Sequence, residues 1–273
     1  MSRFFYLTFL RHLLQLNSQL ICYIDIGCIN IRAFRKPQII HCMESQTVIT
    51  LHSIIKRFPE GEGFFTALNN ISLTICSGEF VGLVGPSGSG KTTLLNIIGS
   101  LDIPSEGDAV VMGQSISRLN AKESAHLRNK HIGFIFQSYN LLPVYSVFEN
   151  IEFALLLQKI PANERRKAVM EALEWVGLTN KAKSRPAQLS GGECQRVAIA
   201  RAMVKRPSVV LADEPSANLD AANSHNILQT MQKLNQELNT TFLFATHDEK
   251  VMQYMKRIIY LKDGVVEKDV SLL

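Results

Sequence analysis

The stretch Phe80-Val81-Gly82-Leu83-Val84-Gly85-Pro86-Ser87-Gly88-Ser89-Gly90-Lys91-Thr92-Thr93 decides the fold. Its first five residues form an apolar run, which is typical of a parallel strand that is buried on both faces. The next eight residues, Gly85 to Thr92, match GxxxxGK[ST] at every fixed position, and Leu94 to Ile98 have the composition of a helix. A strand, a glycine-rich loop and a helix in this order predict a loop that binds phosphate groups.

The residue types in this loop suit a phosphate ligand. Glycines let the backbone approach closely, so that successive N–H groups surround phosphate oxygens at the positive end of the helix. In this motif Lys91 reaches the β- and γ-phosphates, and the hydroxyl of Thr92 is a ligand of Mg²⁺. GTPases, kinases and transport ATPases share the loop, so the loop alone leaves the class of nucleotide-binding protein open.

Two further apolar runs end in polar groups that could act on the same ligand. Ser208 to Ala212 leads into Asp213 and Glu214, and Thr241 to Ala245 is followed shortly by His247. Asp213 is placed to hold Mg²⁺ through its water shell, and Glu214 to polarise an attacking water. His247 would lie beside the γ-phosphate, because parallel strands end at one edge of a sheet. Taken alone, each of these features could be an ordinary loop.

The segment Leu189-Ser190-Gly191-Gly192-Glu193 predicts a second helix start. Ser190 is a suitable N-cap, and the apolar residues after it have helical spacing. A helix N-terminus with two exposed glycines is a candidate anion site. In isolation, however, a capped amphipathic helix without a ligand is the simpler interpretation.

With these motifs in this order, the sequence from about Val48 to Val266 resembles the ATP-binding subunits of ABC transporters. The resemblance implies an α/β fold with a P-loop NTPase core, an antiparallel β subdomain and a helical subdomain at about residues 138–189. It also implies that the chain is an ATPase, with ATP and Mg²⁺ as ligands, whose hydrolysis of ATP powers transport.

The resemblance assigns a role to each motif. It implies that Glu214 is the catalytic base, His247 the switch histidine, and Gln137 the glutamine that senses the metal and the membrane partner. Mg²⁺ would be held by Thr92, Gln137 and Asp213. The residues expected to contact nucleotide are Phe58, Gly85, Pro86, Ser87, Gly88, Ser89, Gly90, Lys91, Thr92, Thr93, Ser190, Gly191, Gly192, Glu193 and Asp220.

Phe58 falls where the family places an aromatic ring that stacks on adenine. A phenylalanine ring suffices for this contact, because stacking uses the ring face. Two alternatives stay open: Phe58 could be a core residue of a hairpin, and Phe64 or Phe65 could stack instead.

Within the family, Leu101–Gly107, Asn140–Pro143 and Leu211–Pro215 resemble the branch that contains lipoprotein-releasing (LolD) and macrolide-export (MacB) ATPases. This implies a head-to-tail homodimer that encloses ATP and works with a separate FtsX/MacB-like permease at the cytoplasmic face of the inner (plasma) membrane. The permease would serve lipoprotein release or the export of drugs, peptides or lipids. The helical subdomain would dock it, and Tyr139, Leu141, Leu142 and Val144 are expected as exposed contacts.

Two other functions remain as alternatives at this point. One is an ABC ATPase with a non-transport role, such as a cell-division type, and the other is a regulatory ATP-binding module that does not turn over.

Composition separates residues 1–42 from the rest of the 273-residue chain. Of the 29 basic and 24 acidic residues, five basic and one acidic lie in residues 1–42, which leaves 24 and 23 in residues 43–273. A near-neutral main part argues against a nucleic-acid partner. We predict that Met43 is the true start of the ATP-binding domain, 43–273. Residues 1–42 would be a leader that either lies on a membrane or belongs to no functional domain.

The five cysteines include no CxxC pair, which predicts free thiols.

Overall fold

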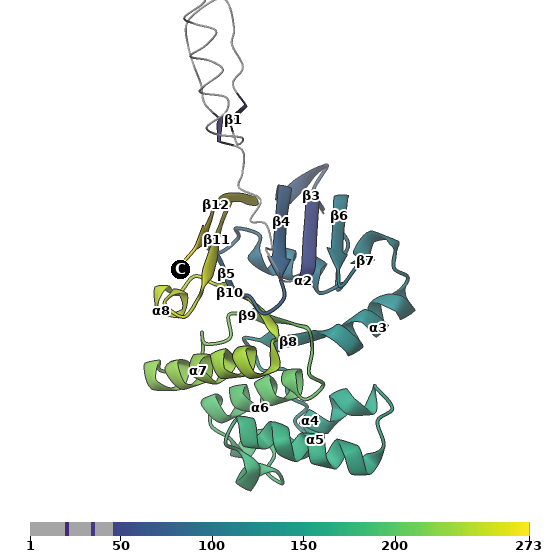
Figure 1. Ribbon diagram of the computed structural model, residues 1–273, viewed down its shortest axis with the longest axis vertical. Helices are drawn as coiled ribbons and strands as arrows, with labels where there is room; N and C mark the ends of the chain where they lie inside the picture. Colours follow the sequence, from purple (N-terminus) through teal and green to yellow (C-terminus); the bar gives the residue numbers. More distant parts are fainter. Residues whose placement is uncertain (1–19, 22–33, 36–45, 273) are drawn as a thin grey trace, which may run out of the picture. The chain divides into compact units, whose positions relative to one another are not determined.

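The computed structural model describes residues 20–21, 34–35 and 46–272. The chain divides into two units, Met1–His41 and Cys42–Leu273 (Figure 1). In the first unit, β1 (Leu20–Ile21) pairs with β2 (Phe34–Arg35) in an antiparallel ladder. The predicted start at Met43 lies outside the described residues.

A six-stranded sheet forms the centre of the second unit, in the order β12-β11-β5-β10-β9-β8. Five strands are parallel and only β12, at one edge, is antiparallel. The buried runs predicted at Phe80–Val84 and Thr241–Ala245 both lie inside this sheet. Their apolar side chains are covered on both faces, as expected of parallel strands. The strands are β5 (Phe80–Val84), β8 (Ile132–Phe136), β9 (Val209–Asp213), β10 (Thr241–Thr246), β11 (Arg257–Lys262) and β12 (Val265–Ser271).

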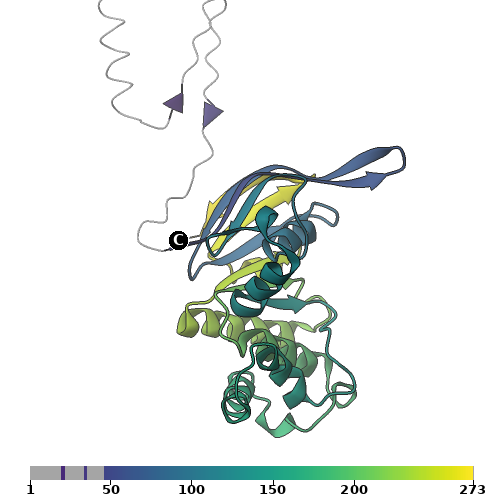
Figure 2. The ribbon, with the colours of Figure 1, turned by 90° about the vertical axis from the view of Figure 1, so that its right-hand side faces the viewer.

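A four-stranded antiparallel sheet packs beside it, in the order β4-β3-β6-β7. Its strands are β3 (Thr47–Glu60), β4 (Gly63–Cys76), β6 (Glu106–Val111) and β7 (Gln114–Ser115). The long β3–β4 hairpin projects well past the rest of the sheet (Figure 2). Ile49, Ile75 and Leu83 belong to one apolar cluster with Leu94 of α2 (Lys91–Ile98), so this core fixes the helix that follows the phosphate loop.

The helices α4, α5, α6 and α7 gather on the side of the central sheet away from β3 and β4 (Figure 1), whereas Leu127 of α3 belongs to the same apolar cluster as Ile49. α4 and α5 lie between Gln137 and Leu189, as predicted, and pack against α6 through a continuous apolar cluster. The helices are α3 (Ala121–His131), α4 (Val147–Leu156), α5 (Ala162–Trp175), α6 (Gly191–Met203), α7 (Ala221–Leu238) and α8 (Glu249–Met252), with 3₁₀ turns at Ile116–Arg118, Thr179–Lys181 and Pro186–Gln188. Among the described residues, no helix combines the length and apolar character needed to cross a bilayer.

The expected docking residues differ in exposure. Leu142 and Val144 are exposed, Val144 by 71%. The expectation of exposure is wrong for Tyr139 and Leu141, which are half-buried. Leu141 packs against the core of the helical subdomain, and the backbone carbonyl of Tyr139 accepts a hydrogen bond from Arg201.

The cysteines also depart from expectation. Cys194 is a buried free thiol, as predicted. Cys76 is disulfide-bonded, so the prediction of free thiols is wrong at that position.

Candidate functional site

A cleft of about 500 Å³ lies at the carboxyl ends of the parallel strands. The phosphate loop follows β5, Gln137 follows β8, Glu214 follows β9, and His247 follows β10. Parallel strands bring residues far apart in sequence to one sheet edge, which is why these four segments meet. The lining residues are Phe58, Phe65, Ala67, Ser87, Gly88, Gly90, Lys91, Thr92, Thr93, Gln137, Asp213, Glu214, Ala217 and His247.

The phosphate loop has a backbone that requires glycine. Gly90, the N-cap of α2, has φ 98°, and a Cβ there would lie 2.7 Å from the carbonyl oxygen of Ala67. A Cβ at Gly85 would lie 2.0 Å from the carbonyl oxygen of Leu261. No side chain of the described residues caps the start of α2. Its first N–H groups are therefore available to an anion at the positive end of the helix.

Lys91 lies along this loop. Its Nζ donates to the carbonyl oxygens of Gly85 at 2.7 Å and Pro86 at 2.9 Å. Burial lowers the pKa of Lys91, and the nearby carboxylates of Glu214 and Asp213 oppose that effect. The ammonium group is thus held at the cleft by neutral partners, and a phosphate oxygen offers it a stronger, charge-assisted bond.

Thr92 and Asp213 meet across the cleft. Thr92 Oγ1 donates to the carboxylate of Asp213, at 3.0 Å from Oδ2 and 3.2 Å from Oδ1. Burial raises the pKa of Asp213, while Thr92 and Lys91 oppose that rise. A hydroxyl, a carboxylate and the nearby Gln137 amide supply hard oxygen ligands, which fit Mg²⁺. No group of three His, Cys, Asp or Glu side chains forms a metal cage in the described part of the chain.

Glu214 and His247 are hydrogen-bonded to each other at the mouth of the cleft. His247 Nδ1 lies 2.6 Å from Glu214 Oε1. The Glu214 side chain is 18% exposed and that of His247 is 60% exposed. Glu214 has a left-handed backbone, φ 48°, and its N–H donates to the carbonyl of Ala245 at 2.9 Å. This turn ends β9 and ties the carboxylate-bearing residue to β10, so two strand ends together position one candidate base.

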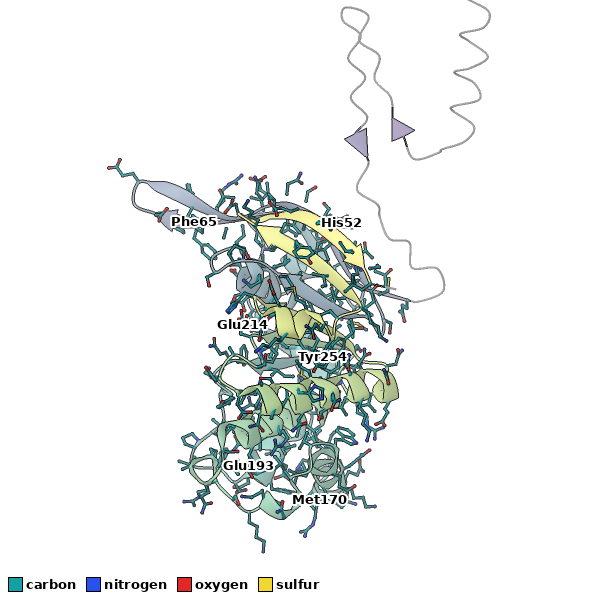
Figure 3. All side chains as sticks on the ribbon, turned by 90° about the vertical axis from the view of Figure 1, so that its left-hand side faces the viewer. His52, Phe65, Met170, Glu193, Glu214 and Tyr254 are labelled. Atoms are coloured by element: carbon teal, nitrogen blue, oxygen red, sulfur yellow. The ribbon has the colours of Figure 1, made fainter. Side chains whose placement is uncertain are left out.

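The predicted residues Ser190, Gly191, Gly192, Glu193 and Asp220 do not line this cleft. Ser190 caps α6 in the predicted way: its Oγ accepts from the Glu193 N–H at 3.2 Å, and its own N–H donates to Glu193 Oε2 at 2.8 Å. Asp220 caps α7 by accepting from the Asn223 N–H at 2.9 Å. In Figure 3, Phe65, Glu214 and Glu193 follow one another along one side of the view, with Glu193 farthest toward the helices. The second predicted anion site is therefore separate from the cleft. Ser190 and Gly191 are exposed there, but Gly192 is buried, so the prediction of two exposed glycines is wrong at Gly192.

Three residues of the phosphate loop also lie outside the lining. Gly85 and Pro86 contribute the carbonyl oxygens that hold Lys91, and Ser89 is 2% exposed behind the loop. These three residues therefore belong to the structure of the loop and do not form part of the cleft surface.

The register of the β3–β4 hairpin places two of the three candidate adenine-stacking residues in the cleft and the third outside it. Phe58 and Phe65 are directly opposite each other in the β3–β4 ladder, and both line the cleft. Phe64 pairs with Pro59, is 71% exposed and does not line the cleft. Lys56 Nζ lies 5.0 Å from the centroid of the Phe58 ring. Ala67 is a lining residue that sequence reasoning missed, because alanine carries no chemical signal; only the tight fit of Gly90 against its carbonyl marks it.

Comparisons with known proteins agree with this geometry. The sequence profile described as ABC transporter matches residues 68–217. A protein named as the uncharacterized ABC transporter ATP-binding protein MJ0796, from Methanocaldococcus jannaschii, is 43% identical over 229 residues, which cover 82% of this chain and 97% of that protein.

Solved structures extend the likeness to the fold. A dimeric structure of the ATP-binding cassette MJ0796 in a post-hydrolysis state, bound to ADP and Pi, has a TM-score of 0.77 at 42% identity and covers 82% of this chain and 99% of that one. The structure of cbiO1 from Clostridium perfringens, part of the ABC transporter complex cbiONQ, has a TM-score of 0.75 at 29% identity, covering 83% and 89%.

Proposed function

This chain belongs to the ABC transporter family as an ATP-binding cassette with an ATPase domain, and from that premise we propose that two copies pack head to tail around ATP. Each nucleotide then lies between the phosphate loop of one copy and the Ser190–Glu193 segment of the other. The dimeric structure of the MJ0796 cassette supports this arrangement.

The proposal rests on one observation. Among the described residues, α2 and α6 both begin with backbone N–H groups suited to an anion, but only the start of α2 lines the nucleotide cleft of the same chain. Two such ends on separate parts of one protomer cannot hold the same phosphate. A second copy, turned to face the first, brings its α6 N-terminus to the open side of the cleft. One ATP then satisfies both ends, so ATP stabilises the dimer and its hydrolysis releases it.

The residues in the cleft divide the chemistry between them. Lys91 and the first turn of α2 bind the phosphates, and Glu214 acts as general base on the attacking water. His247 shares a hydrogen bond with Glu214 and orients that carboxylate. Bound by Thr92, Asp213 and Gln137, Mg²⁺ would neutralise phosphate charge during the transfer.

We place this cassette with a separate permease of the FtsX/MacB-like type, at the cytoplasmic face of the plasma membrane. The three segments that resemble the LolD and MacB branch support this, and cbiO1, which shares the fold, is itself part of a transporter complex. Affinity purification of the full-length chain from its native membranes tests the assignment. A permease of this type should copurify, and a preparation without any membrane protein would contradict the assignment.

Replacing Ser190 with Asp should slow ATP turnover while leaving the affinity of the monomer for ATP unchanged. Asp keeps the N-cap acceptor for the Glu193 N–H but places a negative charge where the partner's phosphate is expected. If the phosphate of ATP loses the favourable interaction with the N-terminus of the partner's α6, worth about 2 kcal/mol, turnover should be roughly thirty-fold slower.

The matched control for that substitution is Ser146→Asp. Ser146 caps α4 through the same reciprocal contacts with Glu149 that Ser190 makes with Glu193. Turnover by Ser146→Asp should stay close to wild type. Equal loss in both variants would mean that Ser190 acts only as a helix cap.

The paired rings Phe58 and Phe65 should both contribute to nucleotide affinity. Base stacking is worth about 1 to 3 kcal/mol, so alanine at either position should raise the Kd for ATP by roughly 5- to 150-fold. Titration of each variant with a fluorescent ATP analogue measures this. Phe64→Ala, which changes an exposed ring outside the cleft, is the control; a comparable loss there, with none at Phe58 and Phe65, would contradict the assignment.

A further inference from the structure

Lys56 on β3 is a buried lysine to which the chemistry of the cleft gives no role. It is 9% exposed, although lysine is seldom buried in proteins, and it does not line the cleft. Residues two apart on a strand face the same side, so Lys56 lies beside the cleft-lining Phe58. Its Nζ lies over the Phe58 ring, 5.0 Å from the centroid. Lys56 thus contacts a ring of the nucleotide site from outside that site.

Two acceptors in the turn after α2 hold the ammonium group. Lys56 Nζ donates to Asp102 Oδ1 at 2.6 Å and to the carbonyl oxygen of Ile103 at 2.9 Å. The lysine and aspartate side chains are 11% and 31% exposed, so water screens this ion pair only in part. The N–H of Asp102 donates to the carbonyl of Asn96 in α2 at 3.2 Å. Lys56 is therefore tied to the end of the helix whose start follows the phosphate loop.

The backbone on either side of Lys56 contacts the same turn. The N–H of Ser105 donates to the carbonyl of Ile55 at 2.8 Å, and the N–H of Arg57 donates to Ser105 Oγ at 3.0 Å. These bonds fix β3 against the turn just before Phe58. The Phe58 side chain itself is 38% exposed, so the Lys56 ammonium is a contact that restrains the ring where solvent reaches it.

We infer that Lys56 is a positioning residue for the base of ATP: its ammonium group covers one face of the Phe58 ring and leaves the other face to stack on adenine. The inference rests on the proposed function, in which Phe58 contributes to nucleotide affinity. A cation is attracted to the negative face of an aromatic ring, and the attraction is stronger where water is partly excluded. A ring that is held in place before ATP arrives costs less entropy to order on binding.

The contact of Lys56 with the turn after α2 has a second consequence. The first turn of α2 and Lys91 bind the phosphates in the proposed function, whereas Phe58 binds the base. Lys56 connects these two parts of the site, because one side chain contacts both the ring and the turn that ends α2. Since it acts through the ring, Lys56 should affect the binding only of ligands that carry a base.

Lys56→Met keeps the length of the side chain and removes its charge. The Kd for ATP should rise roughly 2- to 30-fold, as expected for loss of a cation–π contact. The Kd for inorganic triphosphate with Mg²⁺, which has no base, should stay at the wild-type value. Isothermal titration calorimetry of the full-length chain with each ligand measures both. Equal losses for ATP and triphosphate would overturn the inference, because they would mean that Lys56 shapes the phosphate site.

Arg57→Met is the matched control. Arg57 is the next residue on β3 and forms an ion pair with Glu106 of β6, on the other side of the strand from Lys56. The Kd of this variant for ATP should stay at the wild-type value. Lys56→Arg, which keeps a cation for the ring and donors for Asp102, should retain most of the ATP affinity. A loss with Lys56→Arg as large as that with Lys56→Met would contradict the role of the positive charge.

A double-mutant cycle tests whether Lys56 acts through Phe58. In a Phe58→Ala chain, adding Lys56→Met should change the Kd for ATP less than twofold, because the lysine then has no ring to hold. A further loss as large as in the wild-type background would overturn the inference. If Lys56→Met does not fold, Lys56→Gln takes its place in each measurement: it keeps a donor for Asp102 but carries no charge, and the same losses are expected.

The outcomes separate this inference from the proposed function. If Phe58→Ala weakens ATP binding but Lys56→Met does not, the inference is wrong, and stacking of Phe58 on the base stands. If Phe58→Ala itself leaves the affinity for ATP unchanged, the stacking assigned to Phe58 in the proposed function is contradicted, and the inference falls with it.

Discussion

Glu214→Gln should slow ATP turnover by roughly 10²- to 10⁴-fold, the contribution of a well-placed general base. The carboxylate lies at the end of β9, held toward the cleft by its left-handed backbone and paired with His247 at 2.6 Å. Glutamine has the same shape and can still accept a hydrogen bond from His247, but it cannot take a proton from water. Binding of ATP should therefore survive while hydrolysis does not.

Phosphate release under saturating ATP measures this effect, and a binding titration measures the affinity of the same variant. Glu249→Gln removes an exposed carboxylate two residues beyond His247 and should hydrolyse ATP at the wild-type rate. Turnover by Glu214→Gln above about a tenth of the wild-type rate would show that another group removes the proton.

Lys91→Ala should lower turnover by roughly 100- to 1,000-fold and weaken ATP binding as well. Lys91 Nζ bonds to two backbone carbonyls of the phosphate loop, and the nearby carboxylates of Asp213 and Glu214 leave the cleft rich in negative charge. Without the ammonium group, the triphosphate would enter a site with no cationic side chain among its lining residues except His247 when protonated. Both affinity and rate should then fall.

Lys250→Ala is the matched control, because Lys250 is an exposed lysine on α8 that does not line the cleft. Thermal unfolding of both variants separates loss of function from loss of fold. Normal ATP affinity in a folded Lys91→Ala protein would contradict the role of Lys91 as the phosphate-binding charge.

The sequence predicted the parts of the fold that depend on local patterns. The apolar run at Phe80–Val84, the phosphate loop and the Ser190 cap each follow from residue types at short spacing, and the structure places each as expected. Parallel topology then brings the predicted strand-end groups, Glu214 and His247, into one cleft.

Features that depend on contacts between distant segments were not predictable in the same way. The face of the β3–β4 hairpin that carries Phe58 and Phe65 is set by register shifts along the ladder, which no local pattern reveals. The half-buried state of Tyr139 and Leu141 depends on packing against α6 and the helical core. The partial burial of Arg201 and Lys205 depends on how α6 and the residues after it lie against β8.

The mass of Glu214→Gln in solution tests the shared nucleotide site most directly. Light scattering coupled to size-exclusion chromatography should give a monomer without nucleotide, 30.6 kDa for the 273-residue chain, and a dimer of twice that mass with ATP and Mg²⁺. Adding Ser190→Asp to the same chain should return it to the monomer. A Glu214→Gln protein that binds ATP and yet stays monomeric at saturating nucleotide would contradict the head-to-tail dimer.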